Sequence, residues 1–352
     1  MSTKLREHRS VACRSPQKQS HLVVDLCCGL GGISLAAAQL GMEIFAGVDL
    51  SDQAIRTFAN NFPDAETFVG SVRSKALIGK CAKQVYQHKS GSQKLVVVSG
   101  PPCQGFSVAG PRDPSDPRNQ VLGAVARAIV DLNPKCGLIE NVARVLDPSH
   151  TKRLAKFRKV LNQGGFHVSE IVLNAADYGV PQRRHRAFFF LTKRRISKRK
   201  LNRVLEALHT PPLLVGEALA DLPSPKVRPD RYNDEDDSLV LSNHFAMQHS
   251  QRVKKKIAAI PQGKGPMSYR RLHPERVSNT LISGHRAPPA HYREPRSITV
   301  REAARLQGFP DDFRIYGSFG NQMTQVTNAV PPPMARAALI ALCEVAGVKL
   351  DG

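Results

Sequence analysis

Short apolar segments alternate with helix-like segments along the first half of the chain. The apolar segments are rich in β-branched residues, and those between them, such as GGISLAAAQLG and SDQAIRTFANNF, carry apolar residues at helical spacing. The seven strand-like segments are HLVVDL, EIFAGVDL, ETFVG, KLVVVSG, CGLIENV, HVSEIVLN and HRAFFFLT. Strands that alternate with helices in this way are typical of a doubly wound, mostly parallel α/β sheet.

The pattern changes after residue 192. A charge run at 193–203 is followed by Pro-rich segments, the acidic patch DEDD and mixed polar sequence to about residue 295. No strong period of 2 or 3.6 residues holds there, which predicts a second, smaller and irregular domain at 193–320. The apolar stretch MARAALIALCEVAG is expected to form a closing helix that returns to the sheet. We therefore assign 21–192 plus 321–352 to the larger domain and 1–20 to a basic, disordered arm.

The amino-acid composition of the chain indicates which class of molecule it binds. The chain of 352 residues has 51 Lys and Arg against 29 Asp and Glu, a net charge of +22 that attracts polyanions, so we expect nucleic acid. It has no apolar run of about 18 residues, and its N-terminus lacks the apolar core of a secretory signal, so we expect a cytoplasmic protein away from membranes. The seven cysteines form no CxxC pair and no zinc-ligand spacing, so neither a metal site nor a disulfide framework is expected.

The segment DLCCGLGG follows the first strand and opens the first helix. Gly29, Gly31 and Gly32 allow a tight turn and a close backbone approach, although a plain strand-to-helix turn would look similar. Asp49 ends the next strand about 20 residues later, where a carboxylate can bind both hydroxyls of a ribose. The pair of features indicates a cofactor that contains a nucleoside.

The segment SGPPCQGFS sets Cys103 directly after two prolines at the end of another strand. Ligands of open α/β sheets bind at the carboxyl ends of strands, and the prolines hold the thiol on a stiff loop. Glu140 and Asn141 end the next strand at the same edge. A cysteine can also be a small buried hydrophobe, and we expect that role for Cys27, Cys28, Cys81, Cys136 and Cys343.

In order, the motifs DLCCGLGG, VDLS, GPPCQGFS, ENV, QRRHR, REAARLQGFP and NAVPP span the chain from about residue 22 to 341. This set resembles the cytosine-C5 DNA methyltransferases. The resemblance implies a Rossmann-like methyltransferase fold with a smaller target-recognition domain at 193–320. It also implies methyl transfer from S-adenosylmethionine to C5 of a cytosine in a short duplex DNA sequence.

The resemblance assigns roles to the residues at the strand ends. Cys103 adds to C6 of the cytosine, so that C5 becomes nucleophilic, and Glu140 protonates or hydrogen-bonds N3 and the exocyclic amine. Asn141 helps fix the loop; of Arg184 and Arg186, one supports the catalytic loop and the other lies near the base carbonyl. The cofactor-binding residues implied are Asp25, Leu26, Gly29, Gly31, Gly32, Asp49, Leu50, Ser71, Val72, Pro102, Asn328 and Ala329.

A cytosine in a duplex must be flipped out of the stack before it can react. The segment 107–120 is therefore expected to be a mobile loop that closes over the base. The basic clusters 193–203 and 252–256 are expected to face the phosphate backbone of the duplex. The DNA-binding residues expected are Gln104, Ser107, Arg112, Arg118, Arg270, Arg271 and Arg286.

Three positions depart from the pattern of the family on the cofactor side. Cys27 stands where an aromatic residue is usual, Ser71 where an Asp is usual and Thr327 where a Gly is usual, which predicts weaker recognition of adenine. Two alternatives stay open: a tRNA cytosine-C5 methyltransferase of the same fold, and a DNA-binding protein that has lost turnover. By analogy with the family we expect a nucleoid-associated monomer, with a restriction or defence system as its cognate partner.

Overall fold

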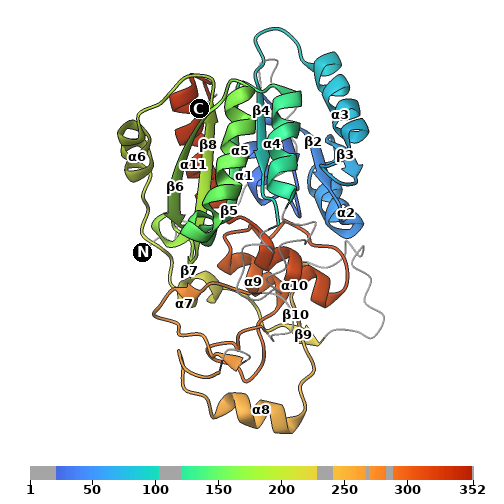
Figure 1. Ribbon diagram of the computed structural model, residues 1–352. Coiled ribbons are helices and arrows are strands. Elements are labelled where there is room, and N and C mark those ends of the chain that lie inside the picture. Colours follow the sequence, from blue (N-terminus) through green and yellow to red (C-terminus); the bar gives the residue numbers. More distant parts are fainter. Residues whose placement is uncertain (1–20, 103–119, 228–240, 267–268, 283–287, 351–352) are drawn as a thin grey trace, which may run out of the picture.

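The computed structural model describes residues 21–102, 120–227, 241–266, 269–282 and 288–350 (Figure 1). Seven strands form one sheet in the order β3-β2-β1-β4-β5-β8-β6. They are β1 (Leu22–Leu26), β2 (Glu43–Asp49), β3 (Glu66–Val69), β4 (Leu95–Ser99), β5 (Cys136–Val142), β6 (His167–Asn174) and β8 (His185–Thr192). All seven predicted strands therefore lie in the sheet.

The sheet is parallel from β3 to β5, and β8 runs antiparallel to both β5 and β6. The segment between β6 and β8 contains only the short helix η4 (Ala175–Asp177) and the two-residue strand β7 (Gln182–Arg183). A parallel pair needs a crossover of a dozen or more residues, so this short connection produces an antiparallel pair. The prediction of a doubly wound, mostly parallel fold is confirmed.

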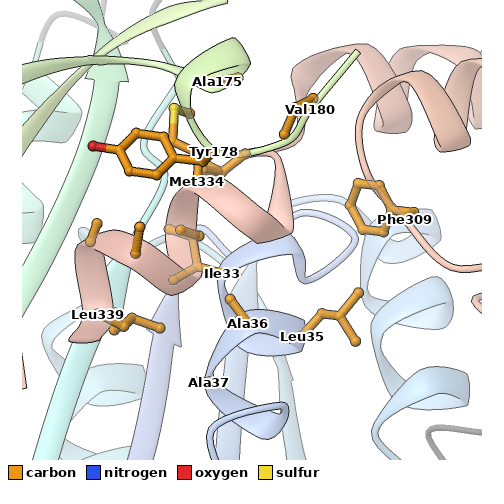
Figure 2. Packing of buried hydrophobic residues seen from close by; sticks show 14 of the residues in the cluster. Ile33, Leu35, Ala36, Ala37, Ala175, Tyr178, Val180, Phe309, Met334 and Leu339 are labelled. Carbon is orange, nitrogen blue, oxygen red and sulfur yellow. The ribbon is translucent and has the colours of Figure 1, made fainter. Parts of the chain in front are cut away.

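Helices cover both faces of the sheet. One hydrophobic cluster joins α1 (Gly32–Ala38), α2 (Asp52–Asn61), α6 (Lys198–Ala207) and α11 (Pro332–Ala346) to one face. The other cluster joins α3 (Lys75–His88), α4 (Val121–Leu132) and α5 (Thr151–Gln163) to the opposite face. Figure 2 shows α1 beside α11, and Ile33 and Met334 belong to one hydrophobic cluster, so the closing helix does return to the sheet as expected.

The stretch Phe319–Ala346 is long and apolar enough to cross a membrane by length and composition, with a mean hydropathy of 1.3 over its most apolar 18 residues. It contains two helices, because α10 (Phe319–Asn328) ends before α11 begins at Pro332. The most apolar window of this stretch is 61% buried inside the protein. Its apolar side chains are thus used to pack the core, as in α11, which lies against α1 and the sheet.

The part of the chain after α6 is irregular, as predicted. Its elements are α7 (Val215–Leu219), β9 (Lys226–Val227), β10 (Phe245–Ala246), α8 (Gln251–Ala258), β11 (Ser278–Asn279) and α9 (Val300–Leu306). Side-chain bonds to backbone carbonyls replace a large sheet here: the fully buried Arg301 donates to the carbonyls of Ser242, Pro310 and Phe313. Apolar side chains of α6 and α9 share the cluster of α1 and α11, and the division at residues 192 and 320 stays a prediction.

Candidate active site

The site lies where the strand order reverses. The chain passes from β1 to β2 on one side and continues from β4 on the other side of β1, so the carboxyl ends of β1 and β4 flank the switch point, and Leu26 pairs with Ser99 there. Ligands of doubly wound sheets bind in the crevice outside such strand ends. The loops after β1, β2, β4 and β5 meet at this end, which we call the rim.

The loop after β1 is shaped by glycines. Gly29 and Gly31 have φ angles of +54° and +97°, a region that side chains other than glycine rarely adopt. A Cβ at Gly32 would lie 2.3 Å from the Val330 carbonyl oxygen, so only glycine lets α1 begin this close to the loop between α10 and α11. The glycine motif therefore brings together two segments about 300 residues apart in the sequence.

Asp49 lies beside this loop at the end of β2. Its Oδ2 accepts a hydrogen bond from the Gly29 N–H at 2.9 Å, and its Oδ1 accepts one from the Ser51 N–H at 2.8 Å. A carboxylate oxygen can accept more than one bond, so both oxygens keep capacity for a hydroxyl donor. The carboxylate that the sequence predicts to bind ribose is thus held in place by two backbone amides.

Asp25 is a buried carboxylate under the same loop, with 1% of its surface exposed. Its Oδ2 accepts a hydrogen bond from the Ser34 hydroxyl at 2.7 Å, whereas Oδ1 has no hydrogen-bond partner among the described residues. Burial raises the pKa of Asp25 to about 7, and the nearby charge of Asp49 adds to the rise. A cation next to Oδ1 would relieve this cost, so the site fits a positively charged ligand.

Two apolar side chains stand exposed next to Asp49. Leu50 follows it and is 74% exposed, and Val69, which pairs with Asp49 across β2 and β3, is 52% exposed. Ser71 follows on the next turn and accepts a hydrogen bond from the Arg73 N–H, and Val72 is buried beneath it. Exposed apolar side chains beside a hydroxyl acceptor fit a flat, partly apolar group such as a nucleobase.

Cys27 occupies an uncommon backbone conformation at the end of β1. Its φ is +59°, in the left-handed region, and its side chain is half-buried. Burial raises the pKa of the Cys27 thiol well above its usual range, with Asp49 and Asp25 adding to the rise, so the thiol stays protonated. Cys27 therefore lies in the glycine loop after β1 as a protonated thiol.

Glu140 is buried at the carboxyl end of β5. Its Oε1 lies 2.8 Å from Nε of Arg186, which stands on the neighbouring strand β8 opposite Val142. Burial raises the pKa of Glu140, although the charges of Arg186 and Arg184 and the bond to Arg186 oppose the rise. Its Oε2 lies 3.9 Å from where a Cβ on Gly100 would stand. A carboxyl group able to carry a proton thus lies under the loop that leads to Cys103.

Asn141 holds that loop from below. Its Nδ2 donates to the Pro101 carbonyl at 3.2 Å, and its Oδ1 accepts from the Val142 N–H at 2.9 Å. Pro102 follows at the same rim, and Cys103 comes next but lies outside the described residues, as do Gln104, Ser107, Arg112, Arg118 and Arg286. The structure thus brings Glu140 and Asn141 next to Gly100 and Pro101, which precede Cys103.

Arg184 is 1% exposed and connects β8 to the loop after α10. Its Nη2 donates to the carbonyls of Thr327 and Ala329 at 2.9 and 3.0 Å. Thr327 lies in the last turn of α10, where its hydroxyl donates a hydrogen bond to the Met323 carbonyl. The next residue, Asn328, is exposed. Arg184 therefore supports the segment that packs on Gly32, on the cofactor side of the rim.

The basic residues that we expect to bind DNA differ in exposure and in their position on the fold. Arg270 is exposed, whereas the Arg271 guanidinium donates to the carbonyls of Ala258, Ile260 and Arg293 and so ties the end of α8 to its neighbours. Helix α8, with cluster 252–256, lies at the lower end of Figure 1. The run 193–203 follows β8 at the end of the sheet opposite the rim, and its contact with the phosphate backbone stays a prediction.

Three side chains with structural roles at the rim were not predicted from the sequence. Ser34 donates to Asp25, Val69 stands opposite Asp49, and the buried Ser99 hydroxyl donates to the Leu26 carbonyl at 2.5 Å and so joins the ends of β1 and β4. Each of these contacts depends on which strands are neighbours or on how α1 packs against β1. In the described part of the chain, no group of three or more His, Cys, Asp or Glu side chains could hold a metal ion.

Comparison with known proteins gives consistent matches. The family model for C-5 cytosine-specific DNA methylases matches residues 22–343. The Type II methyltransferase M1.HphI of Haemophilus parahaemolyticus is 34% identical, over 89% of this chain and 84% of the relative. The Type II methyltransferase M.XorII of Xanthomonas oryzae pv. oryzae is 30% identical, over 89% of this chain and 82% of the relative.

Solved structures show the same arrangement. A candidate DNA modification methyltransferase encoded within a prophage (E. coli) superimposes with a TM-score of 0.76 and 28% identity, covering 93% of this chain and 99% of that one. The S. pombe Dnmt2 methyltransferase superimposes with a TM-score of 0.60 and 16% identity, covering 92% of this chain and 98% of that one, which shows a shared fold.

Proposed function

The chain belongs to the C-5 cytosine-specific DNA methylase family, and on this basis we propose that it methylates C5 of a flipped cytosine in a short duplex DNA sequence through a covalent bond from Cys103 to C6. It is a DNA cytosine-C5 methyltransferase, an enzyme whose family uses S-adenosylmethionine. The observation that carries the proposal is the position of Glu140, buried beside Arg186 beneath the loop that leads to Cys103.

The residues of the rim fit S-adenosylmethionine, which supplies a methyl group on a positively charged sulfur. Asp25 offers a buried carboxylate oxygen without a partner among the described residues, Asp49 offers acceptors for two hydroxyls, and Leu50 with Val69 offers an apolar surface for adenine. The other residues proposed to line this half are Leu26, Gly29, Gly31, Gly32, Ser71, Val72, Pro102, Asn328 and Ala329.

On the base, the proposed steps begin with the thiolate of Cys103, which forms a bond to C6 while Glu140 gives or shares a proton at N3. The C5–C6 double bond opens and its electron pair becomes available at C5, which takes the methyl group. A base then removes the C5 proton, the double bond re-forms, the Cys103–C6 bond breaks with its electron pair returning to sulfur, and the proton at N3 returns to Glu140. The raised pKa of Glu140 supports its part, because a carboxyl group must hold a proton to donate one.

The setting of the reaction follows from the relatives. Their Type II names support a place in a restriction-modification or defence system. We further propose that the protein acts as a monomer in the cytoplasm at the nucleoid, with exposed Arg270 and the basic residues of α8 at the duplex backbone.

Bisulfite sequencing tests the proposal directly. DNA is taken from a host without cytosine methylation that expresses either the chain or its Cys103→Ala variant. We expect protected cytosines at one short recurring sequence with the wild type and none with the variant. If DNA stays unprotected while soluble protein methylates tRNA, or methylates nothing, the proposal is overturned.

A further inference from the structure

The end of the sheet opposite the rim carries a row of basic residues. Lys94 precedes β4, Lys135 precedes β5, and Lys193 follows the antiparallel strand β8. The pairings Val96↔Cys136 and Cys136↔Thr192 place these three positions side by side. Because neighbouring strands are about 4.8 Å apart, the row has one basic residue at each step across three strands.

The row continues on both sides. His21 accepts a hydrogen bond from the Lys94 N–H at Nδ1, and its Nε2 lies 2.9 Å from the Lys349 carbonyl oxygen, so Lys349 extends the row beyond β4. On the other side, Arg194 and Arg195 lead to the start of α6. We call six exposed residues of this row the basic edge: they are Lys94, Lys135, Arg194, Arg195, Lys198 and Lys349.

Lys193 anchors the middle of the row. Its Nζ donates to Asn133 Oδ1 at 2.7 Å and to the Gly164 carbonyl at 3.3 Å, and it lies 3.5 Å from the centre of the Phe166 ring. These contacts fix the corner where β8 ends. The position from which Arg194 and Arg195 start is therefore set by the fold.

Acidic residues do not balance this charge in the described part of the chain. Asp131 and Glu344 are exposed in the last turns of α4 and α11, which end at the same side, and Glu43 at the start of β2 is paired with His88 at 2.7 Å. The cations of the basic edge thus outnumber the exposed carboxylates near them. Clustered like charges destabilise a compact protein, so the basic edge is better explained by a polyanion that binds to it than by solubility.

The basic edge is separate from the rim. Lys135 and Glu140 lie at opposite ends of β5, and its seven residues, at about 3.3 Å each, span about 20 Å. In Figure 1 the start of α6 lies beside the end of the sheet that points away from α8 and α9. A straight duplex seated at the rim therefore leaves these cations unused.

We propose that the basic edge binds the phosphate backbone of a second duplex DNA segment while the rim holds the target segment. Lysine and arginine side chains reach phosphates without reading bases, so this contact is independent of sequence and sensitive to salt. It would keep the enzyme on DNA between target sites. This proposal goes beyond the methylation reaction, and its test does not require turnover.

The test compares two triple variants that remove the same charge. One neutralises the basic edge, Lys94→Gln with Lys135→Gln and Arg195→Gln; the other neutralises exposed lysines on α3, Lys75→Gln with Lys80→Gln and Lys83→Gln. Analytical ultracentrifugation with a short labelled duplex counts the duplexes bound per chain at several salt concentrations. Circular dichroism melting confirms that each variant is folded.

We expect the wild type and the α3 variant to bind two duplexes and the basic-edge variant to bind one. The slope of log affinity against log salt changes by about 0.9 for each phosphate contact, so removing single cations should reduce that slope stepwise for the second duplex. The proposal is overturned if the wild type binds only one duplex, or if the two triple variants lose the second duplex equally. Methylation of a short duplex should be the same in all three proteins, and its absence from all three would instead count against the proposed reaction.

Discussion

The two halves of the rim hold their side chains in different ways. In the half around Glu140, the side chains of Glu140 and Asn141 are buried; Glu140 pairs with Arg186 on β8, and Asn141 donates to the Pro101 carbonyl. In the half around Asp49, Leu50 and Val69 stand open to solvent. Acid–base chemistry depends on a fixed geometry and a controlled protonation state, which burial and bonding provide.

The open half instead depends on contacts from a ligand. Leu50 and Val69 lose contact with water only when a molecule binds over them, and Asp25 Oδ1 has no hydrogen-bond partner among the described residues. The departures from the family pattern, at Cys27, Ser71 and Thr327, all lie on this cofactor side. Residues proposed to face the reacting base are thus constrained from several sides, and we expect residues proposed to face the cofactor to tolerate change at a cost in affinity.

The largest effect is expected from the nucleophile. Cys103→Ala removes the group that activates C5, so methylation should fall by at least about 10³-fold. Duplex binding should stay within a few-fold of the wild type, because the thiol contributes little to it. Radioactive methyl transfer and fluorescence anisotropy measure the two quantities; comparable methylation by the variant would contradict the proposed mechanism.

Glu140→Gln should lower kcat by about 10²- to 10⁴-fold, the usual contribution of a general acid. Burial raises the pKa of Glu140. Because the protonated form is the active one, wild-type kcat should fall as pH rises through that raised pKa. The amide of the variant does not titrate, so this alkaline decline should disappear.

A pH profile of single-turnover rates from about pH 5 to 9 makes the measurement. Glu170→Gln is the matched control, since this carboxylate within β6 also pairs with an arginine, Arg158, outside the rim. An unchanged alkaline decline in Glu140→Gln would show that another group carries the proton.

The Asp25→Asn variant tests whether the half of the rim around Asp49 binds a positively charged ligand. The pKa of Asp25 is raised from 3.8 to about 7 by burial, so the ionised form becomes abundant only near neutral pH. A cationic ligand prefers that form, so wild-type affinity for S-adenosylmethionine should increase from about pH 6 to about pH 8. The variant should bind about 10-fold or more weakly at the higher pH, without this pH dependence. Calorimetric titration at both pH values measures it.

Thermal stability without ligand provides the control for Asp25. The folded-state pKa is higher than the unfolded one, so the folded protein binds the proton more tightly, and stability falls as pH rises from about 4 to about 7. The amide in the Asp25→Asn variant has no such proton, so the variant should lose this part of the decline. If affinity were independent of pH in the wild type, Asp25 would not face the positive charge of the ligand.

Ser71→Asp is expected to have the smallest effect. The hydroxyl of Ser71 accepts a hydrogen bond from the Arg73 N–H, which a carboxylate can also do, and a charged acceptor binds an adenine amine more strongly. The dissociation constant for S-adenosylmethionine should fall by a few-fold to about 10-fold. Ser74→Asp, on the cap of α3, is the control. An unchanged or weaker affinity would mean that Ser71 does not lie at the adenine.

Much of this architecture could be predicted from the sequence, because buried parallel strands appear as apolar runs and the rim motifs follow them directly. Helix α3 was missed, although Ile78, Cys81 and Val85 face the core at helical spacings of three and four residues. The links made by Ser99 and Val69 could not be predicted, because they depend on which strands are neighbours. The positive charge of 193–203 could be read from the sequence. Its position at the end of the sheet opposite the rim could not, because it depends on β8 being antiparallel.

The most direct test of the account uses a duplex in which the target cytosine carries fluorine at C5. Fluorine cannot leave as a proton does, so the bond from Cys103 to C6 should persist after methyl transfer. With S-adenosylmethionine, intact-protein mass spectrometry under denaturing conditions should show one methylated strand attached per chain, located at Cys103 by peptide mapping and absent from Cys103→Ala. Attachment at another residue, or none from a wild-type protein that methylates normal DNA, would contradict the account.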